Sequence, residues 1–198
     1  MMGKLGVDFY QRKDVVQIAR DLVGKLLVTR FNGQVTSGRI VETEAYNGIG
    51  DRASHAFGGR RTNRTSVMYM AGGTAYVYLC YGLHQMFNVV TNVADEPHAI
   101  LIRSVVAVAG TDIIQERLGK KMLKDNLLKG PGVVGKGLGI TTRETGSSLL
   151  DDAIFIEDDD AIVPPGRITA TPRIGVDYAG ADALLPYRFI DSTVKGLK

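Results

Sequence analysis

Apolar residues at the start of the chain follow first a helical and then a strand pattern. Over residues 14–23 (DVVQIARDLV) they recur at helical spacing, and Gly24 follows as a helix-ending residue. The next two runs, KLLVTRF and QVTSGRIVETEAY, have strand character and are separated by Asn32 and Gly33. Because Asn-Gly is the preferred two-residue turn of a β-hairpin, the pattern predicts a helix over 14–23 followed by a hairpin.

A long polar stretch separates this hairpin from three further predicted strands. Residues 47–73 are rich in Gly, Arg, Asn, Ser and Thr, which predicts an irregular loop of a length that is usually functional or disordered. The segments TAYVYLCYG and QMFNVVTNV predict two strands joined by a tight turn at Gly82. The run AILIRSVVAV is apolar almost throughout, so we expect a central strand there.

The second half predicts one more helix and several short strands. Residues 111–118 (TDIIQERL) predict a helix capped by Thr111, and residues 119–139 are rich in glycine and lysine. IFIED, RITATPRIGV and YRFID predict short late strands. The sequence therefore predicts a mixed, largely antiparallel α+β fold, and its length fits a single domain over residues 1–198.

Composition narrows the function only slightly. The net charge of +3 and pI near 9.0 permit a nucleic-acid partner without requiring one. The single cysteine, Cys80, excludes an intramolecular disulfide and fits a reducing cytoplasm. MMGKLGVDFY lacks the apolar run of a signal peptide, and the most apolar stretch, residues 99–110, is too short to span a bilayer. Cys80 and the histidines lack close metal-ligand spacing, so we expect a cytoplasmic protein without a metal or membrane site.

Two glutamates in GRIVETEAY are the first candidates for chemistry. On a strand, Glu42, Glu44 and Tyr46 would point to one face, with the two carboxylates about 7 Å apart. On a buried face such carboxylates are costly unless they have partners, which would indicate a site. On an exposed face the pair would be unremarkable, and this segment alone leaves both interpretations open.

Three tyrosines cluster around the predicted turn. Tyr76 and Tyr78 would share a face, while Tyr81 lies at the turn just before Gly82. Such side chains can stack on nucleobases or pack across strands. We favour packing for Tyr76, whereas Tyr81 at a hairpin tip has little core to contact.

Arginines supply the remaining candidates. Those in the loop around His55 are Arg52, Arg60, Arg61 and Arg64, among Gly58, Gly59, Thr62 and Asn63. Arginine among small polar donors suits phosphate contact, although a solvated loop would have the same composition. Arg103, inside an apolar strand, needs an acidic partner, for which Glu42 and Glu44 are the candidates. A purely structural ion pair is the alternative there.

Taken in order, these motifs resemble one known family. GRIVETEAY, ASHAFGG, RTNR, MYMAGGTAYVYLCYGLHQMFNVV, AILIRSV, GPG…GLGI and PRIGVDYAG are similar to the alkyladenine (3-methyladenine, N-methylpurine) DNA glycosylases. The resemblance runs from about Asp14 to about Ile190, and the block from Gly38 to Asn88 is the most specific part. It implies a compact α+β domain with a curved, mainly antiparallel sheet and a protruding hairpin.

The same resemblance implies a monofunctional enzyme of base excision repair. Its members flip a damaged purine (3-methyladenine, 7-methylguanine, hypoxanthine or ethenoadenine) out of double-stranded DNA and hydrolyse its bond to the sugar. No cofactor or metal is implied. Such enzymes usually act as monomers, here in a bacterial-type cytoplasm at the nucleoid.

Three residues are implied at the attacking water. The second glutamate of E-T-E-A-Y, Glu44, corresponds to the general base, and Arg103 helps to hold the water. The main-chain carbonyl of Ile174 is expected near that water. No lysine falls at a catalytic position, so a Schiff-base route with strand cleavage is not expected.

The resemblance also implies how the base is held. Tyr46 would stack on the flipped base, His55 would lie on its other face and edge, and Tyr78 would complete the aromatic pocket. Asn88 would abut the purine's two-position and exclude normal guanine. Tyr81 would be the wedge that enters the duplex and fills the gap.

Contacts with the DNA backbone are expected from four residues: Arg60, Thr62, Arg64 and Lys136. The family usually has a lysine and leucine after G-P-G, where this chain has Val133 and Val134. That departure predicts weaker duplex binding unless Lys136 or Lys129 substitutes.

Two other functions fit parts of the pattern. A hydrolase of oligosaccharides would use Glu42 and Glu44 as its acid–base pair, but those carboxylates should then flank the substrate. A non-catalytic nucleic-acid-binding module would use the Arg- and Tyr-rich middle and leave Glu44 and Arg103 without a role. Binding and cleavage of a duplex containing one damaged purine would distinguish the three.

Overall fold

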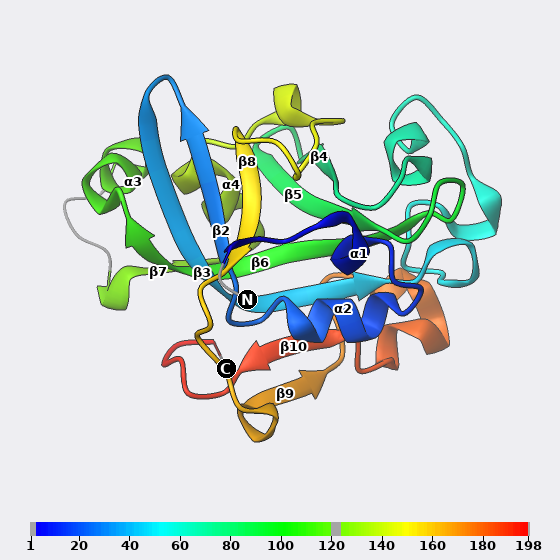
Figure 1. Ribbon diagram of the computed structural model, residues 1–198. Coiled ribbons are helices and arrows are strands. Elements are labelled where there is room, and N and C mark those ends of the chain that lie inside the picture. The colour runs from blue at the N-terminus through cyan, green and yellow to red at the C-terminus, as the bar shows by residue number, and fades with distance from the viewer. Residues whose placement is uncertain (1–2, 120–123, 198) are drawn as a thin grey trace.

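An antiparallel sheet, strongly curled, forms the body of the molecule (Figure 1). The structure is a computed structural model that describes residues 3–119 and 124–197. Within these residues ten strands form one sheet, whose main path runs β1-β8-β2-β3-β6-β5-β4, with β10 pairing β3 and β9, and β7 pairing β6. The strands are β1 (Gly3–Lys4), β2 (Leu26–Phe31), β3 (Gln34–Tyr46), β4 (Thr74–Cys80), β5 (His84–Thr91), β6 (His98–Ala109), β7 (Leu127–Lys129), β8 (Ile154–Asp158), β9 (Ile168–Thr171) and β10 (Arg188–Asp191).

Short helices cover the sheet. They are α1 (Val7–Tyr10), α2 (Val15–Asp21), α3 (Thr111–Leu118) and α4 (Pro131–Leu138). Helix α2 packs against β3, while α4 packs on β5 and β6 and against α3. None of the helices in the described part of the chain has the length and apolar character needed to cross a bilayer. The predicted α+β class with a curved antiparallel sheet is confirmed.

The predicted first helix and hairpin are present. Helix α2 begins after Asp14, whose carboxylate accepts a hydrogen bond from the Gln17 amide at 2.9 Å. Strands β2 and β3 are joined by Asn32 and Gly33, with φ of +53° and +75°. Both residues adopt the left-handed conformation that the preferred hairpin turn requires, which is why Asn-Gly predicted the turn correctly.

The central strands β3 and β6 are out of regular register where they pass the site. Their pairing skips Val41 on β3 and Arg103 on β6. The alternation of side chains therefore changes phase: Ile40 points into the main core before the irregularity, and Ala45 does so after it. As a result Glu44 points to the face opposite the main core.

Two predictions for the second half are wrong. Thr111 is not the cap of α3: the capping position is Gly110, at φ +64°, and no side chain caps the helix. A Cβ at Gly110 would lie 2.4 Å from the Val35 carbonyl oxygen, so this turn selects glycine. The predicted strand RITATPRIGV is present only as β9, because Pro172 follows Thr171 and has no N–H to continue a ladder.

Helix α4 was not predicted, because half of its sequence is glycine or proline. Its glycines allow close packing: a Cβ at Gly135 would lie 2.4 Å from the Gln85 carbonyl oxygen, and one at Gly137 would lie 2.5 Å from Leu128. Tertiary contact here outweighs the poor intrinsic helix propensity of glycine. The helix brings Pro131 to the wall of the cavity described below.

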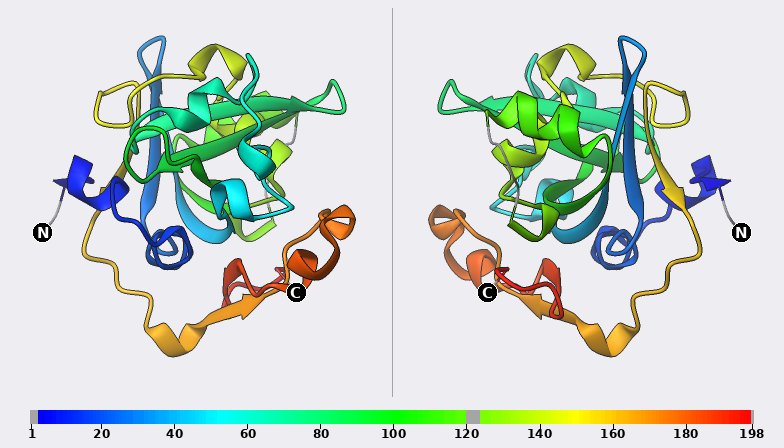
Figure 2. Two further views of the ribbon diagram at one scale, coloured as in Figure 1. Left: turned by 90° about the vertical axis from the view of Figure 1, so that its right-hand side faces the viewer. Right: turned by 90° about the vertical axis from the view of Figure 1, so that its left-hand side faces the viewer.

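The loop over residues 47–73 is irregular, as predicted. Its regular parts in the structure are three single turns of 3-10 helix, Gly48–Gly50, Phe57–Gly59 and Ser66–Tyr69. Figure 2 shows the β4–β5 hairpin and the segment after β9 projecting on the same side of the molecule.

Candidate active site

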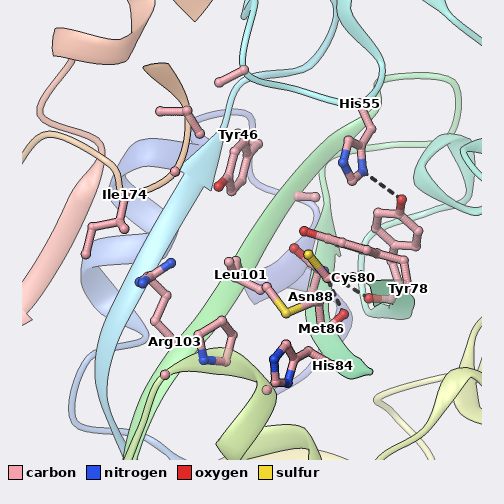
Figure 3. Close-up of a pocket in the computed structure, with 18 of the residues that line it drawn as sticks. Tyr46, His55, Tyr78, Cys80, His84, Met86, Asn88, Leu101, Arg103 and Ile174 are labelled. Atoms are coloured by element: carbon pink, nitrogen blue, oxygen red, sulfur yellow. Dashed lines mark hydrogen bonds between the residues drawn. The ribbon is translucent and has the colours of Figure 1, made fainter. Parts of the chain in front are cut away.

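A cavity of about 410 Å³ opens between the β4–β5 hairpin, the 47–73 loop, the start of α4 and residues 174–178. This volume is within the range usual for small-molecule sites. In Figure 3, Tyr46 lies on one side of the cavity, and His55 and Tyr78 lie on the opposite side. The cavity therefore has aromatic walls facing each other.

Glu44 lies directly behind one wall of this cavity and is fully buried. Its Oε1 accepts a hydrogen bond from the Ile174 amide at 2.7 Å. Its Oε2 accepts from the Tyr46 hydroxyl at 2.9 Å and from Arg103 Nη1 at 3.3 Å. All three donors line the cavity. A carboxylate offers about four acceptor positions, so three are filled and one, on Oε1, is left for another donor.

Burial raises the pKa of the Glu44 carboxyl above its ordinary value. The charge of Arg103 and the hydrogen bonds from the Ile174 amide and the Tyr46 hydroxyl act in the opposite direction, and the charge of Glu42 adds to the increase. A buried carboxylate with a raised pKa accepts a proton more readily than an exposed one, which suits a general base.

Glu42 has a different environment, although it also contacts Arg103. Its Oε1 accepts from Arg188 Nε at 2.6 Å and Arg103 Nε at 3.2 Å, and its Oε2 accepts from the Ser104 hydroxyl at 2.5 Å. The predicted acidic partner of Arg103 is thus confirmed as two residues, Glu42 and Glu44. Glu42 does not line the cavity. Its hydrogen bond with Arg103 instead helps to fix the position of that guanidinium.

The contacts of His55 define its protonation. Nδ1 lies 2.8 Å from the Tyr76 hydroxyl, and Nε2 lies 3.4 Å from Arg64 Nη2. Because a guanidinium can only donate, Nε2 is the acceptor, and Nδ1 carries the hydrogen that is donated to Tyr76. Burial, followed by the charges of Arg64 and Arg60, lowers the pKa of His55 to about 4. The imidazole is therefore neutral at physiological pH.

Replacing Arg64 is expected to change this titration. In Arg64→Gln the pKa of His55 should rise because the nearest positive charge is gone, and it should stay below the ordinary value of 6.5 because burial is unchanged. The C2 proton of His55, followed by NMR as a function of pH, measures the shift. Arg61→Gln is the matched control, since Arg61 pairs with Asp95. Equal pKa values in both variants would contradict the role of Arg64.

The neighbouring tyrosines build the wall beside His55. The Tyr78 ring meets the His55 ring edge to face at 4.7 Å, and the Arg64 guanidinium lies 4.7 Å from the Tyr78 ring centre. Tyr76 is buried and packs against Tyr78 at 5.4 Å. Packing was predicted for Tyr76 across strands, but this contact is within β4, and the residue opposite Tyr76 on β5 is Asn88. The hydrogen bond of Tyr76 to His55 was not predicted from the sequence.

Asn88 lines the cavity and is held by main-chain groups. Its Nδ2 donates to the carbonyl oxygens of Tyr76 at 3.2 Å and Met86 at 3.0 Å. Both amide hydrogens are thereby used, so the side chain has a fixed orientation at the cavity wall. These hydrogen bonds are those of a structural asparagine, and the side chain lies at the cavity wall.

Tyr81 forms the tip of the β4–β5 hairpin and is 92% exposed, as predicted for this position. Tyr81 and Gly82 have φ of +51° and +71°, and the Leu83 amide closes the turn on the Cys80 carbonyl at 3.1 Å. A left-handed conformation is unfavourable for tyrosine, so the hairpin holds an exposed aromatic ring in a strained turn. Leu83 is exposed beside it.

Three of the residues expected at the DNA backbone lie on the 47–73 loop, and the fourth lies on α4. Arg60 and Thr62 are exposed on the 47–73 loop, and Lys136 is exposed on α4. Arg64 is also exposed, and its guanidinium lies over the ring of Tyr78, which lines the cavity.

The two valines after G-P-G differ in exposure. Val134 is fully buried in the main core, whereas Val133 lines the cavity. Neither supplies a charge, so Lys136 is the basic residue that α4 presents to solvent.

An ion pair that the sequence did not predict connects the two loops around the cavity. Arg173 Nη1 and Nη2 lie 2.5 and 2.9 Å from the two carboxylate oxygens of Asp51, and the Arg173 side chain is fully buried. Arg173 also donates to the Ala45 carbonyl and lies 4.9 Å from the Tyr46 ring centre. The partners are 122 residues apart in sequence, so no local spacing could indicate the pair.

The described residues contain no group of three or more His, Cys, Asp or Glu side chains arranged to hold a metal ion.

Comparison with known proteins covers nearly the whole chain. Residues 8–195 match the family described as Methylpurine-DNA glycosylase (MPG). A Chlamydia felis protein named "Putative 3-methyladenine DNA glycosylase" is 44% identical over 96% of this chain and 97% of its own length. Proteins of the same name from Bacillus thuringiensis and Chlamydia pneumoniae are 44% and 42% identical, over 91% and 92% of this chain and 92% of their own lengths.

Proposed function

The chain belongs to the methylpurine-DNA glycosylase family, whose activity is the hydrolysis of N-glycosyl bonds in DNA, and we propose that it removes alkylated and deaminated purines. In this proposal the damaged base is flipped into the cavity, and a water activated by Glu44 attacks the sugar. The substrates proposed are 3-methyladenine, 7-methylguanine, hypoxanthine and ethenoadenine in double-stranded DNA. The single domain acts as a monomer, and its reaction initiates base excision repair. The observation that carries the proposal is the buried Glu44 carboxylate, with one free acceptor position behind the cavity wall.

The chemistry requires a base and a negative charge near the sugar. As the purine leaves, positive charge grows on the deoxyribose, and a carboxylate there both deprotonates the water and stabilises the cation. Glu44 has the free acceptor position for the water proton. Arg103 holds the carboxylate from one side, and the Ile174 amide fixes it from the other.

The walls supply binding for the flipped base. Tyr46 faces His55 and Tyr78 across the cavity, which suits a flat base stacked between them. A purine alkylated at N3 or N7 is cationic, leaves readily, and is favoured by electron-rich rings. Hypoxanthine and ethenoadenine are neutral, so each must be protonated before it can leave the sugar. Their selection would depend on contacts with the neutral His55.

A duplex with a single hypoxanthine tests the proposal. Incubation with the protein, followed by heating in alkali, should cut the strand at the hypoxanthine, because removal of the base leaves an alkali-labile abasic site. Binding without a cut would favour a non-catalytic nucleic-acid-binding module. Failure to bind the duplex would favour a hydrolase of other sugars.

The wedge role of Tyr81 predicts a defect in binding. Tyr81→Ala should weaken binding to a lesion-containing duplex by about 1–3 kcal/mol, the scale of one aromatic–base stack, with a smaller effect on hydrolysis once the base is bound. Fluorescence of 2-aminopurine placed beside the lesion reports unstacking. Leu83→Ala, at the same exposed tip, is the comparison variant. The same unstacking signal for Tyr81→Ala and the unaltered protein would contradict the wedge role.

The proposed gate at Asn88 predicts a change of selectivity. Guanine has an amino group at C2, where hypoxanthine and adenine-type lesions have hydrogen, and a fixed Asn88 side chain would clash with it. Poorly paired buried donors cost about 1–3 kcal/mol each, enough to reject a normal base. Asn88→Ser should raise the release of undamaged guanine relative to hypoxanthine on otherwise identical duplexes. An unchanged ratio in a folded variant that still releases hypoxanthine would place selectivity elsewhere.

A further inference from the structure

An exposed tyrosine lies at the rim of the cavity, in the segment that also contacts Glu44. Tyr178 is 71% exposed and lines the cavity, four residues after Ile174, whose amide binds the Glu44 carboxylate. An exposed aromatic ring that lines a cavity is available to contact whatever enters that cavity. None of the roles assigned above uses this ring.

The ring is held in place. The Tyr178 hydroxyl donates to the Ala53 carbonyl at 3.0 Å, which ties it to the 47–73 loop. The residues on either side, Val176 and Ala179, are buried in a small cluster with Ala53 and Tyr46. Tyr178 is therefore exposed on a backbone that is anchored on both sides, so a ligand that contacts the ring loses little entropy in ordering it.

The position of the ring limits what it can touch. The faces of the base are already provided for by Tyr46 on one side and by His55 and Tyr78 on the other. Attack by a water on Glu44 requires the sugar carbon to lie near Glu44, and Tyr178 belongs to the same cavity-lining segment as Ile174, whose amide binds that carboxylate. Partial burial raises the pKa of Tyr178. The charge of Arg173 lowers it, whereas the charges of Asp51 and Glu44 add to the increase, so the Tyr178 ring is within electrostatic reach of the Glu44 carboxylate.

We propose, resting on the function proposed above, that Tyr178 is a sugar-contacting residue whose ring packs against the deoxyribose of the flipped nucleotide and stabilises the positive charge that grows there as the base leaves. A tyrosine ring face attracts cations. The contact therefore strengthens as the sugar becomes cationic, and Glu44 acts on the same charge from within the protein.

Abasic-site analogues separate this role from ordinary DNA contact. One duplex carries tetrahydrofuran, a neutral sugar analogue, and the other carries a pyrrolidine, which is cationic at neutral pH. In the unaltered protein the pyrrolidine duplex should bind more tightly. In Tyr178→Leu this preference should fall by about 2- to 30-fold, the range of a cation–π contact. In Tyr178→Phe, which keeps the ring and loses only the hydroxyl, the preference should be retained.

Two matched measurements complete the test. Leu184→Ala, an exposed apolar residue of the same segment outside the cavity lining, should keep the preference for pyrrolidine. Graded fluorination of a phenylalanine at position 178 weakens the charge attraction of the ring at nearly constant volume, so the preference should fall stepwise even if the leucine variant folds poorly.

Two results would overturn the inference. They are an unchanged preference in Tyr178→Leu, whether or not both affinities fall equally, and a loss in Tyr178→Phe as large as in Tyr178→Leu. The last would assign the effect to the tether on Ala53. Release of hypoxanthine by the unaltered protein is measured in the same series. Absence of release contradicts the proposed function, whereas normal release with an unchanged Tyr178→Leu preference contradicts only the role of Tyr178.

Discussion

Glu44→Gln should abolish most base excision while lesion binding is kept. Loss of one proton transfer to a general base alone is worth about 100-fold or more in rate. The amide also cannot stabilise a growing positive charge as a carboxylate does. Single-turnover excision of hypoxanthine, with binding of the same duplex measured separately, checks the prediction.

Glu42→Gln is the matched comparison. Its carboxylate accepts from Arg188, Arg103 and Ser104, and it does not line the cavity, so its replacement should reduce the rate less. Gln at position 44 leaves at least one of the three hydrogen-bond donors to Glu44 without an acceptor. The thermal unfolding of each variant is therefore measured together with its excision rate. Near-normal excision by folded Glu44→Gln, with a large loss in Glu42→Gln, would reverse the two roles.

Arg173→Met should be the most destabilising of the single substitutions considered. It leaves the buried Asp51 carboxylate without its partner, and removing one member of a buried pair costs about 3–5 kcal/mol of unfolding free energy. It also removes the cation beside the Tyr46 ring and the donor to the Ala45 carbonyl. Urea denaturation at pH 7 measures the loss.

Arg167→Met is the control for this effect. Arg167 pairs with Asp191 at 3.2 Å, but its side chain is 44% exposed, so its loss should cost less than about 1 kcal/mol. Adding Asp51→Asn to Arg173→Met should recover part of the stability, because the orphan charge is removed. If Arg173→Met costs no more than Arg167→Met, the buried pair does not stabilise the fold.

The sequence predicted those features that depend on local patterns. Asn32 and Gly33 specified a turn through their own backbone preferences, and α2 had both apolar periodicity and a cap at Asp14. The convergence of Glu42 and Glu44 on Arg103 also followed, because a guanidinium in an apolar strand needs carboxylates.

Features that depend on tertiary contact could not be predicted in this way. The glycines of α4 lower helix propensity in isolation and become favourable only against β5 and β7. The Arg173–Asp51 pair and the Tyr76–His55 hydrogen bond join residues far apart along the chain. Gly110 replaces the expected Thr111 cap because the Val35 backbone passes too close for a side chain.

The phase change between β3 and β6 has a consequence for anyone wishing to transplant this site. If β3 paired with β6 without the irregularity, Glu44 would share a face with Ile40, and its carboxylate would point where the host scaffold keeps its apolar interior. The nine letters GRIVETEAY therefore do not encode the site by themselves. A graft would need both strands, with the skipped residues Val41 and Arg103 kept in place. Only then could the host hold a buried Glu44 behind a cavity on one face and keep a filled interior on the opposite face.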